Sequence, residues 1–153
     1  MASILIVYAS MSGNTEEILD VIKGRLEELN HDVTVEEIED IEAESMLNYD
    51  AVLLGSYTWG DGELPYETED FYDELDVVDI SGKPVAVFGS GDTDYPKFCE
   101  AVDIFEFKLK ECGAELIQQG LKIELAPESE EDKKKCITFA ENVSTFFETK
   151  IDI

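Results

Sequence analysis

The sequence contains few basic residues. Its 153 residues include 11 lysines and arginines against 37 aspartates and glutamates, which gives a formal charge of -26. No lysine or arginine occurs between Arg25 and Lys83. Because this charge repels nucleic acid and anionic membrane surfaces, the sequence argues against both as partners. It favours encounter with proteins that carry a basic patch, although a charge excess can also serve solubility alone.

Residues that build metal sites, disulfides and membrane anchors are also scarce. The three cysteines form no CxxC pair and the only histidine is His31, so we expect neither a zinc site nor a disulfide framework. No apolar run approaches the roughly 20 residues of a membrane span, and no basic leader region precedes the first apolar run. We expect a cytoplasmic, monomeric protein with a single domain over residues 1–153.

The chain alternates between apolar strands and amphipathic helices. The predicted strands are 4–9, 33–38, 51–55, 84–89 and 114–125, with a bend at Gly120 in the last and an edge position for the acidic second. The predicted helices are one capped by Asn14 or Thr15 and ending near Asn30, then 66–75, 98–112 closed by Gly113, and 130–149. Right-handed crossovers turn this pattern into a doubly wound α/β fold, a five-stranded parallel sheet with helices on both faces. In such sheets ligands bind where the loops after the first, third and fourth strands meet.

The loop after the first strand, here called the phosphate loop, is rich in hydroxyl groups. It comprises Ser10, Met11, Ser12, Gly13, Asn14 and Thr15. Its hydroxyls, its backbone N–H groups and the positive end of the following helix can converge on one phosphate. The loop holds no lysine or arginine, the first in the chain being Lys23. We therefore expect a single terminal phosphate rather than a triphosphate with magnesium.

The loop after the third strand, residues 56–65, contains the only tryptophan, Trp59. A flat aromatic ligand would give this side chain a stacking partner, and the alternative is that it folds back over the core. Gly60 permits positive φ, so the Gly60-Asp61 peptide can change orientation at low cost. We call this segment the tryptophan loop.

The loop after the fourth strand, residues 89–99, offers a second exposed aromatic residue, Tyr95. Ser90 and Gly91 can bring backbone polar groups close to the edge of a ring. Asp92 could bind a ligand N–H or hydroxyl, or equally cap the next turn. Cys99 could line the pocket, but a small buried hydrophobic residue at a helix start is the favoured interpretation. We call this segment the tyrosine loop.

One phosphate site, two aromatic faces and a glycine-containing peptide together indicate flavin mononucleotide (FMN). Other phosphate-binding classes lack their motifs, since neither GxxxxGK[ST] nor GxGxxG occurs. A phosphorelay receiver would need acidic residues at Tyr8-Ala9 and an aspartate at Gly55-Ser56. A low-molecular-weight phosphatase would need a cysteine in the phosphate loop, and none is present.

Three motifs resemble those of the flavodoxins, and the resemblance spans the whole chain. They are SMSGNT after the first predicted strand, TWGDGELP after the third and GSGDTDYPKFC after the fourth. The absence of a long insertion in 116–125 is typical of the short-chain branch. The resemblance implies strand order 2-1-3-4-5. It assigns the phosphate to residues 10–15 and the two ring faces to Trp59 and Tyr95. The remaining implied contacts come from Tyr57, Thr58, Gly60, Asp61, Ser90, Gly91, Asp92 and Cys99. Two residues depart from the family pattern. Met11 stands where the family commonly has a hydroxyl residue, and Tyr57 stands where it commonly has a smaller hydroxyl residue.

The resemblance implies a low-potential one-electron carrier that works through the semiquinone/hydroquinone couple of FMN, without substrate turnover of its own. The implied partners are a flavodoxin reductase or similar donor and acceptor enzymes, each with a basic docking patch. Two alternatives remain at this stage. One is a flavoprotein devoted to a single metalloenzyme, such as manganese ribonucleotide reductase, and the other is a flavin enzyme that reduces quinones.

Overall fold

The computed structural model describes residues 2–10, 13–58, 64–92 and 99–151. The strands are β1 (Ser3–Tyr8), β2 (Asp32–Glu37), β3 (Ala51–Tyr57), β4 (Pro84–Gly91), β5 (Glu115–Leu116) and β6 (Leu121–Glu124). The α-helices are α1 (Asn14–Glu28), α2 (Glu69–Glu74), α3 (Glu100–Glu111) and α4 (Glu130–Ile151), and three short 3₁₀ helices are η1 (Ile38–Asp40), η2 (Ala43–Asn48) and η3 (Tyr66–Thr68). The predicted helices and the first four predicted strands are found with ends displaced by a few residues, whereas the fifth predicted strand is divided into β5 and β6.

The sheet is parallel throughout its described strands. Its order is β2-β1-β3-β4, and both β5 and β6 pair with β4 on the far side. This arrangement confirms the doubly wound fold and the order 2-1-3-4-5, with β5 and β6 sharing the fifth place. The acidic strand β2 lies at the edge, as its alternating pattern predicts.

The prediction of one continuous strand over 114–125 is wrong, because residues 117–120 leave the strand conformation. The pairing runs from Val85 with Leu116 to Phe88 with Leu121, so the outer strand contains two extra residues. The Gly120 N–H donates to the Glu106 carboxylate on α3 at 2.9 Å, which draws the chain away from β4. The bend expected at Gly120 is therefore an interruption of the strand.

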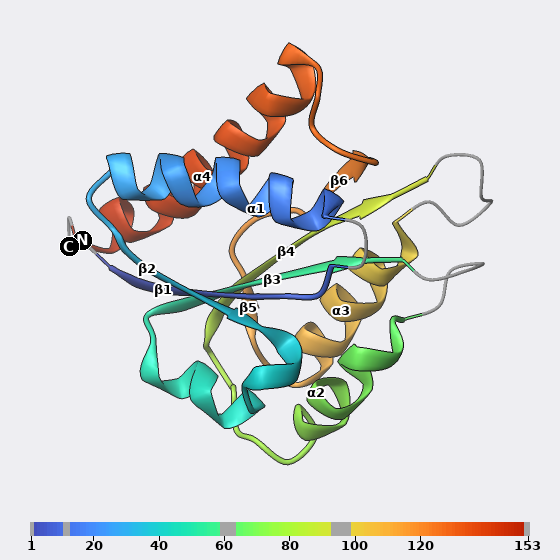
Figure 1. The fold of residues 1–153 in the computed structure, drawn as a ribbon. Helices are drawn as coiled ribbons and strands as arrows, with labels where there is room; N and C mark the ends of the chain where they lie inside the picture. The colour runs from blue at the N-terminus through green and yellow to red at the C-terminus, as the bar shows by residue number, and fades with distance from the viewer. Residues whose placement is uncertain (1, 11–12, 59–63, 93–98, 152–153) are drawn as a thin grey trace.

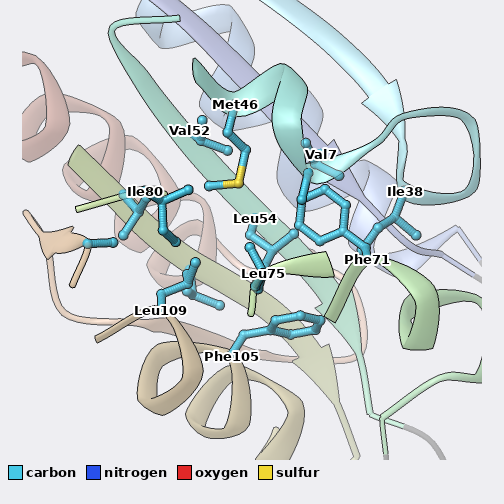
Figure 2. Packing of buried hydrophobic residues seen from close by; sticks show 14 of the residues in the cluster. Val7, Ile38, Met46, Val52, Leu54, Phe71, Leu75, Ile80, Phe105 and Leu109 are labelled. Atoms are coloured by element: carbon cyan, nitrogen blue, oxygen red, sulfur yellow. The ribbon is translucent and has the colours of Figure 1, made fainter. Parts of the chain in front are cut away.

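Helices cover both faces of the sheet (Figure 1). On one face α1 and α4 lie side by side, and the rings of Phe88 on β4 and Phe139 on α4 meet edge to face at 6.2 Å between centroids. On the other face, η2, α2 and α3 press their apolar residues against β3 and β4. Figure 2 shows Met46, Phe71, Leu75 and Phe105 converging there on Leu54. Both faces are thus sealed by apolar side chains, as a parallel sheet requires.

The ends of the helices differ in part from the sequence prediction. The residue that caps α1 is Gly13, in the left-handed conformation at φ 88°, and Asn14 and Thr15 lie inside the first turn. The predicted capping by Asn14 or Thr15 is therefore wrong. Gly113 follows α3 at φ 91°, which confirms the predicted left-handed ending.

His31 links the start of β1 to α4 at the amino-terminal edge of the sheet. Its Nδ1 accepts the Ala2 N–H at 3.1 Å, and its Nε2 lies 2.8 Å from the Ser144 hydroxyl. Since Nδ1 accepts, the neutral ring carries its proton on Nε2. The ring also packs against Phe147, with 6.1 Å between centroids. This contact fixes the C-terminal half of α4 to the edge opposite the three loops.

The described helices are amphipathic rather than apolar. In α4 the buried side chains of Cys136, Phe139, Ala140 and Val143 alternate with exposed polar ones. Across the described ranges, no helix has the length and the apolar character needed to cross a bilayer.

Candidate functional site

The candidate site is built at the edge where β1, β3 and β4 end. Gly55 on β3 pairs with Tyr8, and the Ala9 N–H donates to the Gly55 carbonyl at 2.9 Å. One step further along the sheet, Tyr57 on β3 pairs with Ser90 on β4. The phosphate, tryptophan and tyrosine loops therefore leave the sheet from the same edge, as the alternation of strands and helices predicts.

The phosphate loop enters α1 through a tight turn. The Gly13 N–H donates to the Ser10 hydroxyl at 3.1 Å, and the left-handed φ of Gly13 lets the chain reverse into the helix. A Cβ built on Gly13 would meet no heavy atom within 4 Å, so open space lies above the turn. The first N–H groups of an α-helix have no partner inside the helix, which leaves those of α1 available as donors at this turn. Met11 and Ser12 lie outside the described residues.

The side chain of Thr15 is directed to β4. Its hydroxyl lies 2.9 Å from the Ser90 hydroxyl, and both residues are buried. The bond joins the phosphate loop to the first residues of the tyrosine loop. The sequence reasoning assigned both residues to one site but did not predict this contact, because residues 75 positions apart carry no mutual signal in one sequence.

Backbone atoms approach one another closely at the end of β4. A Cβ on Gly91 would lie 2.8 Å from the Cys99 nitrogen and 2.9 Å from its Sγ, so only glycine fits there. The Gly91 carbonyl accepts the Leu125 N–H at 2.8 Å, which fixes it to the chain after β6. Asp92 is half-buried beside this glycine. Tyr95 lies outside the described residues.

Cys99 is fully buried at the start of α3. Its Sγ lies 3.9 Å from the Gly89 carbonyl oxygen and 3.8 Å from that of Ile123. Burial raises the pKa of the thiol to about 12, so it is neutral at physiological pH. These features match the small buried hydrophobic residue that the sequence favoured at this position.

The ends of the tryptophan loop are fixed by side chains. The Tyr57 hydroxyl donates to the Glu67 carboxylate at 2.6 Å, and the Thr58 hydroxyl accepts the Ala101 N–H at 3.1 Å. Burial, followed by the bond to Glu67, raises the pKa of the Tyr57 phenol. The sequence places Glu67 among the acidic residues around the ligand, but it does not predict the bond between Glu67 and Tyr57. Trp59, Gly60 and Asp61 lie outside the described residues.

The surroundings of the phosphate loop are acidic. A small hollow beside Ser10 is lined by the carboxylates of Glu37, Glu39 and Glu67, and the Tyr8 hydroxyl donates to Glu37 at 3.3 Å. A phosphate at this edge would be held by hydroxyl and N–H donors against a negative background. The open space above Gly13, the first-turn N–H groups and the glycine at position 91 fit a phosphorylated ligand that makes close backbone contacts.

The sequence and the fold are both similar to those of known proteins. The family profile described as Flavodoxin matches residues 6–139. Probable flavodoxin 1 of Bacillus subtilis (strain 168) is 54% identical over 140 residues, which make up 92% of this chain and 89% of the relative. The flavodoxin of Maridesulfovibrio salexigens is 42% identical over 135 residues, 86% of this chain and 92% of the relative. The crystal structure of oxidised flavodoxin 2 from Bacillus cereus has a TM-score of 0.91 and 62% identity, covering 94% of this chain and 99% of that one.

Proposed function

The chain belongs to the flavodoxin family, whose members bind FMN and carry electrons without turning over a substrate, and on that premise we propose that it is a low-potential one-electron carrier. It shuttles electrons between a reductase and acceptor enzymes. As a family member it is an electron carrier, so the quinone-reducing enzyme considered above is set aside. Bound FMN supplies the redox chemistry, and the protein sets which of its oxidation states is favoured.

The observation that carries the proposal is the common edge of β1, β3 and β4. The Thr15–Ser90 bond and the pairing of Tyr57 with Ser90 bring the three loop starts together at this edge. Such a convergence is the usual ligand position of a doubly wound sheet. It supports one elongated ligand that reaches from the start of α1 to the end of β4.

The proposed contacts divide between the phosphate and the ring. Residues 10–15 hold the phosphate through the Ser10, Ser12 and backbone N–H donors, and Thr15 contributes its N–H while its hydroxyl is engaged by Ser90. Trp59 and Tyr95 cover the two ring faces. The Gly60-Asp61 peptide is proposed to lie near the flavin N5 atom, where its carbonyl would accept a hydrogen bond from N5–H when that atom is protonated.

The remaining contacts come from the end of β4. Ser90, Gly91 and Asp92 face the polar edge of the ring and the ribityl chain. The tight fit of Gly91 against Cys99 supports a backbone contact at this point, with Cys99 acting as packing beneath it. Cys99 is therefore proposed to support the site through Gly91 rather than through its thiol.

The acidic residues give the carrier its partners and contribute to its low potential. A negative field disfavours an additional negative charge on the bound cofactor. It therefore lowers the midpoint potential of the semiquinone/hydroquinone couple. The same field attracts redox partners with basic patches, and salt should weaken the encounter. We place the protein in the cytoplasm as a monomer, with residues 1–153 forming one FMN-binding domain.

The experiment is to measure the absorbance of the purified protein and its response to stepwise reduction. A flavin spectrum with one FMN per chain and two resolved one-electron steps is expected. Reconstitution of the apoprotein with riboflavin provides the control, since it lacks the phosphate and should bind far more weakly. A chain that binds neither flavin, or binds both equally, would contradict the proposal.

A further inference from the structure

A hydrogen bond that the sequence did not predict joins Tyr57, at the end of β3, to Glu67, two residues beyond the tryptophan loop. The Tyr57 hydroxyl and the Glu67 carboxylate are 2.6 Å apart, and nine residues, 58–66, lie between them in sequence. Both side chains are half-buried, and Tyr57 packs against the apolar cluster beneath the sheet. A bond to a carboxylate in such a setting is stronger than one between neutral groups.

Each partner projects from a fixed part of the backbone. Tyr57 is the last residue of β3 and pairs with Ser90. Glu67 lies in η3, where the buried Thr68 donates both its hydroxyl and its N–H to the Pro65 carbonyl, at 2.7 and 2.9 Å. The bond therefore connects two ordered anchors rather than two mobile side chains.

The pair also reaches the phosphate loop. Glu67 lines the same small hollow as Ala9 and Ser10, so it lies near the first residue of the phosphate loop. The raised pKa of Tyr57 keeps its phenol protonated, which preserves the donor over the physiological pH range. The pair thus lies at the start of the tryptophan loop and near the start of the phosphate loop.

We propose that Tyr57 and Glu67 are positioning residues that hold the end of β3 against η3 and so fix the separation of the two segments that flank the tryptophan loop. The inference rests on the proposed function, because the loop between them holds Trp59, Gly60 and Asp61. Fixing the flanks of a binding segment in advance removes part of the entropy cost of binding. Through this separation the pair acts on FMN affinity and on redox potential, in addition to any contact that Tyr57 itself makes with the flavin.

Two substitutions distinguish the effect of the Tyr57–Glu67 hydrogen bond from the effect of the Glu67 charge. Tyr57→Phe removes the donor and keeps the Glu67 charge, whereas Glu67→Gln removes the charge and keeps an oxygen that accepts from Tyr57. We expect Tyr57→Phe to weaken FMN binding by about three- to tenfold, the range of one hydrogen bond, and to change the gap between the two midpoint potentials. Glu67→Gln should change FMN affinity by less, and the double variant should match Tyr57→Phe. Tyr66→Phe and Glu69→Gln are matched controls at neighbouring exposed positions and should leave both quantities at wild-type values.

The opposite pattern would overturn the proposal. If Glu67→Gln and Glu69→Gln alter the potentials equally while Tyr57→Phe changes nothing, the carboxylate acts only through its charge. Equal FMN affinity and equal potentials in wild type and Tyr57→Phe would also overturn it.

A measurement on the apoprotein distinguishes failure of the pair from failure of the proposed function. Hydrogen exchange of the backbone amides of Thr58, Leu64 and residues 66–68 should be faster in Tyr57→Phe than in wild type, with no change in α4. This readout does not require flavin, so a wild-type protein that binds no FMN would refute the carrier role while the exchange data still test the pair. Unchanged exchange in Tyr57→Phe would show that the bond does not hold η3 against the end of β3 and would overturn the inference.

Discussion

The hydroxyl groups of Thr15 and Ser90 lie 2.9 Å apart and join the first turn of α1 to the end of β4. Thr15 has no exposed surface and Ser90 is 3% exposed, so neither hydroxyl has free access to water. A buried hydroxyl that loses its partner costs about 1–3 kcal/mol. The contact therefore couples the stability of the fold to the geometry of the site.

Thr15→Val should destabilise the apoprotein by about 1–3 kcal/mol, because valine keeps the shape of threonine and leaves the Ser90 hydroxyl buried without this partner. Thr15→Ser keeps the hydroxyl and should lose much less. Urea denaturation of the two apoproteins measures the difference, and FMN titration should rank them in the same order. Equal stability of the two variants would show that the bond contributes nothing.

Gly91→Ala should destabilise the protein by about 1–3 kcal/mol, since overpacking costs energy of this order. The added Cβ would lie 2.8 Å from the backbone nitrogen of Cys99, which cannot move aside cheaply. Gly24→Ala is the matched control, because a Cβ there meets nothing within 4 Å and lies inside α1. It should stabilise the protein by about 0.5–1 kcal/mol. Thermal unfolding measures both variants. If the space around the added Cβ were irrelevant, the two substitutions would change the stability in the same direction.

Alkylation of the native protein at pH 8 should modify Cys112 and spare the other two cysteines. Cys99 and Cys136 are fully buried, and burial raises the pKa of each thiol to about 12. Cys112 is only half-buried. Mass spectrometry should detect one label per native chain and three after unfolding, and none in native Cys112→Ser. Early labelling of Cys99 would mean that the end of β4 opens in solution.

Glu106→Gln should change how stability depends on pH. Burial raises the pKa of the Glu106 carboxyl, and the bond from the Gly120 N–H offsets part of this effect. A carboxyl with a raised folded-state pKa stabilises the fold below its ordinary pKa of about 4.3 and loses that contribution as the pH rises. Glutamine still accepts from Gly120, so the variant should match wild type near pH 4 and exceed it by less than about 1 kcal/mol at pH 7.

Urea denaturation across this pH range measures the Glu106→Gln effect. Glu111→Gln, at an exposed position on the same helix, controls for the removal of one negative charge. If both variants have the same pH profile, the effect belongs to net charge and not to the buried position of Glu106.

The sequence predicted the strands well because buried parallel strands are continuous apolar runs, as in β3 and β4. It failed where a single backbone contact decides the outcome. Asn14 and Thr15 are good capping residues, yet Gly13 takes the cap position because the turn from Ser10 requires a left-handed residue. The break in the fifth strand depends on the bond from Gly120 to Glu106, which periodicity does not encode.

The candidate site was predictable to the level of loops but not of contacts. Hydroxyl and glycine residues after strand ends identify a ligand edge from sequence alone. The bonds Thr15–Ser90 and Tyr57–Glu67 join residues whose pairing no local pattern reveals. For Tyr57, the one available signal was a bulky phenol in place of a smaller hydroxyl residue, which indicates that its hydroxyl group must find a partner elsewhere.

The contact of His31 with Ala2 and Ser144 has a practical consequence for measuring electron transfer. The His31 contact lies at the amino-terminal edge of the sheet, whereas the three loops leave from the carboxyl edge. A linker attached near Ala2 would therefore anchor the molecule to an electrode by its rear side. The immobilised protein would present its electron-exchanging edge to the solution, where a partner in free diffusion could reach it.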